Sequence, residues 1–287
     1  MRIVHGITVA FIVVGKRAYF VDIFSGDKLK HYTSLFSIVW SAAPIIAPFF
    51  GAYLQTAFGW ESNFYLLGYF ALVMIILELI FGGESLSIFH KFHFKSIINV
   101  YSSLLKTISF SLGLIVLGLS NAVFMVYGMN GPFIIEHTYQ YPAITTGYCA
   151  LILGIALLLG GFLGKAMINY DFHKKITVAM LVQAVAVLTM IFSPLIFSNL
   201  TTLIVFAFII HFSSGFVFNN YFSYCLGLFP KNAGIASGVT GGSIYVITSI
   251  LSYGIVYFIP ADAQVNLGLS YLVLIFLTIV TLFFTKK

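Results

Sequence analysis

The chain has 287 residues, of which 60% are hydrophobic and only 8% charged, and its mean hydropathy is +1.05. Water-soluble domains carry about 25% charged residues, so a soluble fold of this composition would expose far more apolar surface than a monomer tolerates. These values exclude a soluble globular protein and indicate that the solvent is lipid, where every backbone polar group needs a partner within the protein. Long apolar runs without strand alternation favour helices over a β-barrel.

Nine segments are long and apolar enough to cross a bilayer, which requires about 20 such residues. Turn-forming residues separate them, as at Ser25-Gly26-Asp27 and at Pro142, Pro230 and Pro260. The predicted fold is therefore an all-α integral membrane bundle. In chain order, the predicted spans are Met1–Phe24, Tyr32–Ala57, Phe64–Gly82, Thr107–Met129, Ile144–Ile168, Ile176–Phe197, Thr201–Leu228, Ala233–Ile259 and Leu267–Thr285.

The formal net charge of +6 comes from basic residues in short loops, not from a single solvated face, which argues against nucleic acid as a partner. Eleven lysines lie in loops on one side of the predicted membrane. The loops on the other side contain Glu61, Glu136 and Asp262 but no Lys or Arg. The positive-inside rule then places the lysines and the C-terminus in the cytoplasm.

Nine spans with a cytoplasmic C-terminus place Met1 outside the cell or within the membrane. The first span opens directly on Met1-Arg2, and no signal-peptide n-region or small-residue cleavage site accompanies it. We therefore expect an N-terminal truncation that has removed an odd number of spans.

The longest polar interval, Gly83 to Lys106, divides the chain into three parts. We predict a first part of three spans (1–84), a cytoplasmic linker (85–106) and a second part of six spans (107–287). Two interpretations of the linker stay open: an amphipathic helix on the anionic inner leaflet, or an unstructured loop. Its histidines are expected to be solvated rather than metal-bound. Cys149 and Cys225 lie within apolar spans and are expected to be small buried hydrophobes.

The first two spans carry paired motifs. The first span begins Met-Arg-Ile-Val-His-Gly-Ile at residues 1–7, and the second contains Ala43-Pro44-Ile45-Ile46-Ala47-Pro48-Phe49-Phe50-Gly51-Ala52. These residues resemble helices four and five of the major facilitator superfamily, with the bicyclomycin-resistance-type branch (Bcr/CflA) of drug/proton antiporters as the nearest match. That branch has Arg-x-x-Gln-Gly in helix four and a Gly/Ala-Pro-x-x-Gly-Gly antiporter motif in helix five. His5, Ala47 and Ala52 depart from the pattern.

Further along, Tyr127 with Gly131-Pro132-Phe133 is similar to the family's helix seven, and Lys231-Asn232-Ala233-Gly234 to its entry into helix eleven. The resemblance implies a twelve-helix bundle of which this chain holds helices four to twelve. It also places the interval 85–106 at the family's central cytoplasmic loop.

Arg2 is the first candidate for a functional charge, because ionisable groups within lipid are costly and usually serve a function. The resemblance implies that its counterpart in helix four couples proton and substrate. The alternative is an arginine that reaches the interface from a chain end.

Three faces of small residues allow close helix contacts. The second span carries Ala43, Ala47 and Gly51 at i, i+4 and i+8, beside Pro44 and Pro48, which should bend the helix. A second face contains Gly160 and Gly164, and the resemblance implies that these two spans meet across the halves. A third face, Gly234, Gly238 and Gly242, would contact a family helix that this sequence lacks, so we expect it to be without a partner.

Polar side chains in the fourth and seventh spans are the substrate-cavity candidates, because the family's helices seven and ten line its central cavity. Each could equally serve a structural hydrogen bond. They are Asn121, Tyr127, Asn130, His211, Phe216, Asn219 and Asn220.

The function that this sequence favours is secondary active transport: proton-coupled efflux of drugs or other lipophilic small molecules by a monomer in the bacterial inner membrane. An importer or uniporter of the same superfamily and a non-transporting remnant are the alternatives. No acidic residue lies in the middle of a span, which weakens the case for proton coupling. We expect no enzyme activity, cofactor or metal site, since the chain has no nucleophile–base pairing, metal triad or phosphate loop.

Overall fold

The computed structural model describes residues 2–24, 28, 43, 46–83, 94–167, 169–229, 233–260 and 262–285. Over these residues the chain is helical throughout, and it contains no strand. Within the described ranges, seven helices are long and apolar enough to cross a membrane, which confirms the third to ninth predicted spans. They are Glu61–Phe81, Ile108–Thr138, Ala143–Ala166, Phe172–Leu195, Leu200–Gly227, Ile235–Phe258 and Gln264–Thr285.

The first predicted span corresponds to helix α1 (Arg2–Ile23). Half of the second, including Pro44, lies outside the described residues. Its last part is helical over 46–58 and leads through Gly59, with a φ of +84°, into α3 (Glu61–Phe81).

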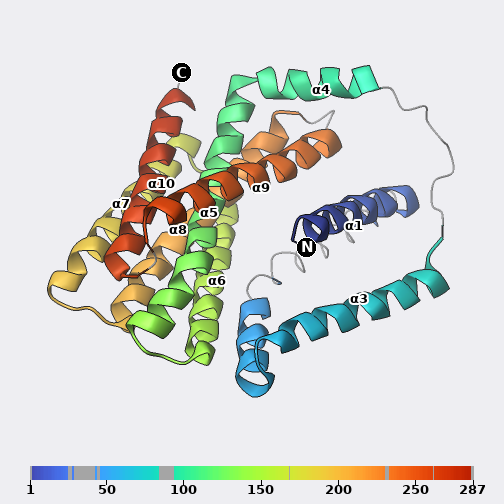
Figure 1. Ribbon diagram of the computed structural model, residues 1–287. Helices are drawn as coiled ribbons and strands as arrows, with labels where there is room; N and C mark the ends of the chain where they lie inside the picture. The colour runs from blue at the N-terminus through green and yellow to red at the C-terminus, as the bar shows by residue number, and fades with distance from the viewer. Residues whose placement is uncertain are drawn as a thin grey trace.

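Six helices from the second part of the chain form one packed bundle (Figure 1). Helix α5 (Ile108–Phe133) contacts α8 (Leu200–Gly227), α9 (Ala233–Phe258) and α10 (Gln264–Thr285). Helix α6 (Ala143–Ala166) packs along α8, and α7 (Phe172–Phe192) packs against α8 and α10. The buried apolar core lies between these helices.

Helices α6 and α8 make the most extensive contact of the bundle, because small residues bring their backbones together. A Cβ on Gly160 would meet the carbonyl oxygen of Phe212, and one on Gly215 would meet that of Leu157. Each helix thus contributes a glycine at the point where the other helix's backbone passes. Small residues serve this role in membrane bundles, where lipid provides no hydrophobic drive for helices to associate.

Helix α5 extends beyond the predicted end of its span at Met129. It includes Pro132 and runs on as a π-helix, Ile134–Thr138. Proline is tolerated within membrane helices because local π adjustments satisfy the freed backbone groups. The predicted span Thr107–Met129 is therefore too short at its C-terminal end.

Helices α1 and α3 lie to one side of the bundle and run across the direction of α5 (Figure 1). None of the residues of α3 is buried, and the described side chains of α1 are mostly exposed. Among the described residues, neither helix makes an extensive contact with α5–α10. The segment 46–58 reaches the bundle through its contact with α6.

The two ends of the bundle differ in charge. Lys106, Lys165 and Lys174 lie at the end where α5 and α7 begin and α6 ends. At the opposite end, the Thr138 hydroxyl donates to the backbone carbonyl of Asp262 at 2.6 Å, near Glu136. This distribution is the one expected from the lysine pattern of the loops.

Candidate functional site: a buried polar cluster

Four side chains from three helices form a polar cluster in the core of the bundle: Tyr127 and Asn130 from α5, His211 from α8 and Tyr271 from α10. Asn130, His211 and Tyr271 are 0% exposed, and Tyr127 is 2% exposed. The His211 ring is central. Its centroid lies 5.5 Å from the Tyr127 ring and 6.1 Å from the Tyr271 ring, both edge-on.

The local sequence explains the placement of the α5 members. Tyr127 and Asn130 are three residues apart and therefore share one helix face. Gly131 provides the space for the tyrosine, because a Cβ at that position would lie 2.6 Å from Tyr127 Cε2. The Tyr-x-x-Asn-Gly-Pro stretch thus places a hydroxyl and an amide together, directly before the π-helix.

The cluster is unusual for its lack of hydrogen bonds. Among the residues that the structure describes, six buried side-chain polar atoms have no partner, and five of them are here. The five are Tyr127 Oη, Asn130 Nδ2, Asn130 Oδ1, His211 Nε2 and Tyr271 Oη. Each such atom costs about 1–3 kcal/mol when it stays unpaired. A concentration of this cost on three facing helices indicates a site that receives a polar guest, either water or part of a ligand.

The backbone fixes the tautomer of His211. Its Nδ1 lies 2.8 Å from the carbonyl oxygen of Ala207, which can only accept, so Nδ1 carries the hydrogen and donates it. In the neutral ring, Nε2 is then an acceptor. With two phenol groups and one amide, the cluster offers both donors and acceptors and contains no acidic side chain. This composition suits an uncharged hydrogen-bonding group.

The remaining candidates from the sequence lie elsewhere. Asn121 donates to Thr248 Oγ1 of α9 at 3.2 Å, and Asn220 donates to the Phe216 carbonyl at 2.9 Å. Phe216 and Asn220 lie against Gly164 at the α6–α8 contact, with Asn219 beside Gly161 and Gly164. The seven predicted residues therefore occupy three places and do not line one common cavity. The prediction brought together Tyr127, Asn130 and His211 and missed Tyr271.

The glycines that were predicted to form the interface between the two halves have other neighbours in the structure. The close contact of Gly160 and Gly164 is with α8, and Gly51 faces Asn63 at the start of α3, with Oδ1 3.2 Å from a Cβ built at Gly51. The segment 46–58 does meet α6, but at Gly147, where a built Cβ would lie 2.8 Å from Ala52 Cβ.

Two further positions of this segment take part in the α6 contact, Pro48 through its carbonyl oxygen and Phe49 through its Cα. Ala47 is exposed. On α9, nothing lies within 4 Å of a Cβ built at Gly238 or Gly242, as expected for a face without a partner. The Arg2 side chain and Pro44 lie outside what the structure describes.

Aromatic side chains hold the second meeting point between the two regions of the chain. Tyr53 Oη and Tyr148 Oη are 2.9 Å apart, and the Phe49 ring lies 5.2 Å from the Tyr148 ring. This contact is the part of the predicted interface between the second and fifth spans that the structure shows, carried by aromatic residues beside the small ones.

Two glutamines within the spans, whose side chains are hydrogen-bonded to neighbouring helices, were not predicted from the sequence. Gln183 of α7 donates to the Ile210 carbonyl and to Ser214 Oγ of α8 at 3.2 and 2.7 Å. Gln264 of α10 bonds Tyr139, Met190, Ser193 and Thr202. The rule that amides within spans need partners would have found Gln183 if it had been applied to every span. The described residues include no group of three His, Cys, Asp or Glu placed to hold a metal.

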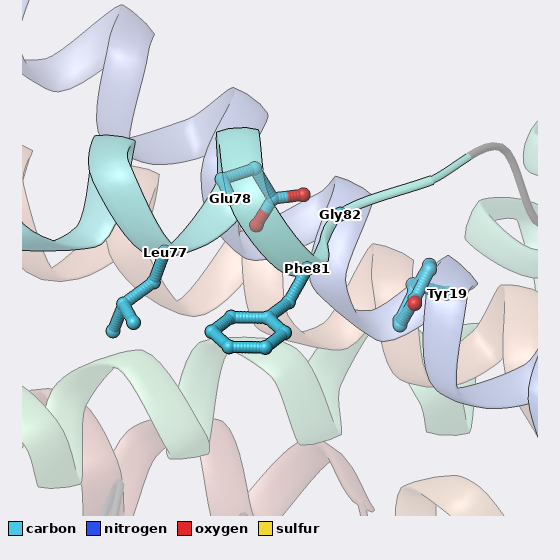
Figure 2. Close-up of a pocket in the computed structure, with 5 residues that line it drawn as sticks. All are labelled: Tyr19, Leu77, Glu78, Phe81 and Gly82. Atoms are coloured by element: carbon cyan, nitrogen blue, oxygen red, sulfur yellow. The ribbon is translucent and has the colours of Figure 1, made fainter.

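A separate pocket of about 280 Å³ lies between the ends of α1 and α3, lined by Tyr19, Leu77, Glu78, Phe81 and Gly82 (Figure 2). Figure 2 shows Tyr19 of α1 facing the last turn of α3, where the Glu78 carboxylate lies near Gly82. This pocket lies outside the bundle and shares no residue with the buried cluster. We therefore place the candidate site at the cluster.

The six-helix bundle with its buried polar cluster and the outlying α3 together give seven membrane-length helices among the described residues, the architecture of a polytopic membrane protein of the transporter type. Residues 1–253 match the Major Facilitator Superfamily, and the chain belongs to that family. It is 24% identical over 257 residues to the protein named uncharacterized MFS-type transporter YdgK of Bacillus subtilis, covering 88% of this chain and 64% of that protein. It is 34% identical over 77 residues to a bicyclomycin resistance protein homolog of Haemophilus influenzae, covering 27% of this chain and 19% of that protein.

Proposed function

We propose that this chain is part or all of a secondary transporter that exports drugs or other lipophilic small molecules across the bacterial inner membrane in exchange for protons. The observation that carries the proposal is the buried polar cluster around His211, which lies in the membrane-spanning part of a major facilitator protein. The likeness over 77 residues to a bicyclomycin resistance homolog supports drugs as the substrate class.

In this proposal the cluster recognises the polar group of an otherwise apolar substrate. His211 Nε2 and Asn130 Oδ1 accept hydrogen bonds, while the two phenols and Asn130 Nδ2 donate them. The surrounding rings, including Phe124 at 6.3 Å from His211, supply apolar contact. A few placed polar groups in an apolar site are typical of small-molecule binding. Access opens when the bundle and the first region rock against each other, as in alternating access.

Proton coupling is assigned to Arg2 through the family resemblance. An uncoupled uniporter or importer is the second candidate, because none of the chain's eight acidic residues lies in the middle of a predicted span. The direction of flux separates the two candidates. In inverted vesicles, an antiporter accumulates substrate when a proton gradient is applied, whereas a uniporter equilibrates it regardless of that gradient.

The test is drug susceptibility of an efflux-deficient bacterium that expresses the chain. We expect increased resistance to bicyclomycin or to lipophilic cationic dyes, abolished by a protonophore and by Arg2→Ala. Resistance that persists in the Arg2 variant removes Arg2 from the mechanism. A chain that reaches the membrane and confers no resistance and no flux in any arm contradicts the proposal.

A further inference from the structure

Helix α4 (Phe94–Lys106) differs from every other helix of the described chain in its pattern and position. At 13 residues it is about 20 Å long, which is too short for a hydrocarbon core of about 30 Å. It continues from the lysine-rich start of α5 and runs across the direction of that helix, out to the side of the bundle (Figure 1). With the bundle spanning the membrane, a short helix in this position is at the depth of the lipid headgroups.

The two faces of α4 are chemically distinct. Ile98, Tyr101 and Leu105 recur at i, i+3 and i+7, within roughly 60° of one another around the helix, and are 45–49% exposed. The adjoining part of the helix surface is polar, with Ser102, Lys106, Asn99 and Ser103 at about 40° to 140° from Ile98 around the helix. Separated apolar and polar faces on a helix with a lysine distinguish an interfacial helix from a spanning one.

The junction with α5 fixes the direction of α4. Thr107 is extended, with φ −76° and ψ 104°, and interrupts the helix. Its amide donates to the Leu104 carbonyl at 3.1 Å, and its hydroxyl donates to the Ser103 carbonyl at 3.2 Å. The Ser111 hydroxyl of α5 reaches back to the Leu105 carbonyl. Leu104 itself is buried, 1% exposed, in the bundle core, so the corner is held both by hydrogen bonds and by packing.

The charge of this stretch favours an anionic surface. From Ser85 to Lys106 the sequence contains Lys91, Lys95 and Lys106, with His90 and His93, and no Asp or Glu. Lysine near an anionic leaflet is attracted to the phosphates, and the attraction falls off within a Debye length. Lys165 and Lys174 lie at the same end of the bundle, so the positive charge extends beyond α4.

From these observations we propose that α4 is a membrane-surface helix that binds the anionic phospholipids of one leaflet. Ile98, Tyr101 and Leu105 enter the boundary between headgroups and acyl chains, and the lysines pair with headgroup phosphates. The corner at Thr107 transmits this anchoring to α5, the helix that carries half of the polar cluster. The surface is independent of which substrate the protein transports.

The test uses tryptophan as a depth probe in the full chain, with Trp40 and Trp60 replaced by Phe. Tyr101→Trp places the probe on the apolar face, and Asn99→Trp is the matched variant on the polar face. Both positions are exposed, so both variants are expected to fold, which size-exclusion chromatography checks. Each is placed in nanodiscs with acyl-chain-brominated lipid, containing either phosphatidylcholine alone or added phosphatidylglycerol.

We expect a blue shift and loss of emission at position 101, no loss at position 99, and a larger loss at 101 with phosphatidylglycerol. Replacing Lys91, Lys95 and Lys106 by Gln should remove the phosphatidylglycerol dependence. Equal quenching at the two positions, or none at either, would overturn the proposal and indicate a surface that faces water or a protein partner. Quenching at 101 that ignores both phosphatidylglycerol and the lysines would overturn its anionic-lipid part.

Discussion

The bundle α5–α10 and the first region, formed by α1, 46–58 and α3, differ in burial, although α3 is as apolar as the helices of the bundle. Helix α5 buries residues on more than one face, whereas α3, which is equally apolar, buries none. The difference lies in the residues that allow helices to approach, because Gly160, Gly215 and Gly113 sit at contacts in the bundle. By contrast, Gly6, Gly15 and Gly68 of the first region have no neighbour within 4 Å of a built Cβ.

This contrast shows that hydrophobicity determines whether a helix enters the membrane and that contact residues determine what it packs against. A span without a close partner satisfies its backbone internally, so its apolar surface alone does not fix its direction. The satisfied amides of Gln183 and Gln264 add specific contacts in the bundle. In the described part of the first region, a comparable hydrogen bond to the bundle joins Tyr53 and Tyr148.

The largest effect is expected from Gly160→Leu. The new side chain would collide with the Phe212 backbone of α8, and moving a helix backbone is costly, so unfolding should become easier by more than about 3 kcal/mol. The matched control is Gly68→Leu in α3, where the space is open and the substitution should leave stability unchanged or higher. Thermal unfolding in detergent, followed by size-exclusion chromatography, measures both. Similar losses in the two variants would contradict the contrast between the regions.

A smaller effect is expected from Gln264→Ala. The change removes hydrogen bonds to α7 and α8, including one of the two that the Met190 carbonyl accepts, which should cost about 1–3 kcal/mol. Gln55→Ala, at an exposed position of the first region, is the matched control and should stay within about 0.5 kcal/mol of the parent. The same unfolding measurement applies. A silent Gln264→Ala would mean that the Gln264 side chain does not stabilise the bundle.

The smallest effect concerns the link between the regions. Tyr148→Phe removes one exposed hydrogen bond while it keeps the ring contact with Phe49, so we expect a loss below about 1 kcal/mol. A double-mutant cycle with Tyr53→Phe isolates the pair, and the double variant should lose no more than either single variant. Simple additivity of the two losses would show that the hydroxyls do not interact.

Much of the fold could be predicted from the sequence, because apolar length and the positions of lysine are read directly from it. Seven predicted spans appear as membrane-length helices among the described residues, but α5 runs past its predicted end at Met129, through Pro132 and into a π-helix. The candidate site was predicted only in part. Tyr127, Asn130 and His211 were found as polar residues within spans, but their meeting with Tyr271 depends on how α5, α8 and α10 pack.

The glycines Gly160 and Gly164 also show that packing partners could not be predicted from the sequence. A face of small residues predicts that a helix will be approached closely, but it carries no information about which helix approaches. Gly160 and Gly164 therefore pair with α8, in the same half, instead of with the segment 46–58. Asn121 and Asn220 could not be separated from Asn130 by residue type, since only the fold shows which amides are satisfied.

The central claim is that the unsatisfied cluster around His211 serves transport while the satisfied amides serve packing. The most direct measurement is substrate flux into proteoliposomes for the parent chain, His211→Leu and Gln183→Leu, each normalised to folded protein. We predict that His211→Leu keeps its stability and that its flux falls at least about tenfold. A tenfold change corresponds to about 1.4 kcal/mol, roughly the contribution of one hydrogen bond between uncharged groups. Gln183→Leu should lose stability and keep its flux per folded molecule. Undiminished flux in His211→Leu would contradict the account.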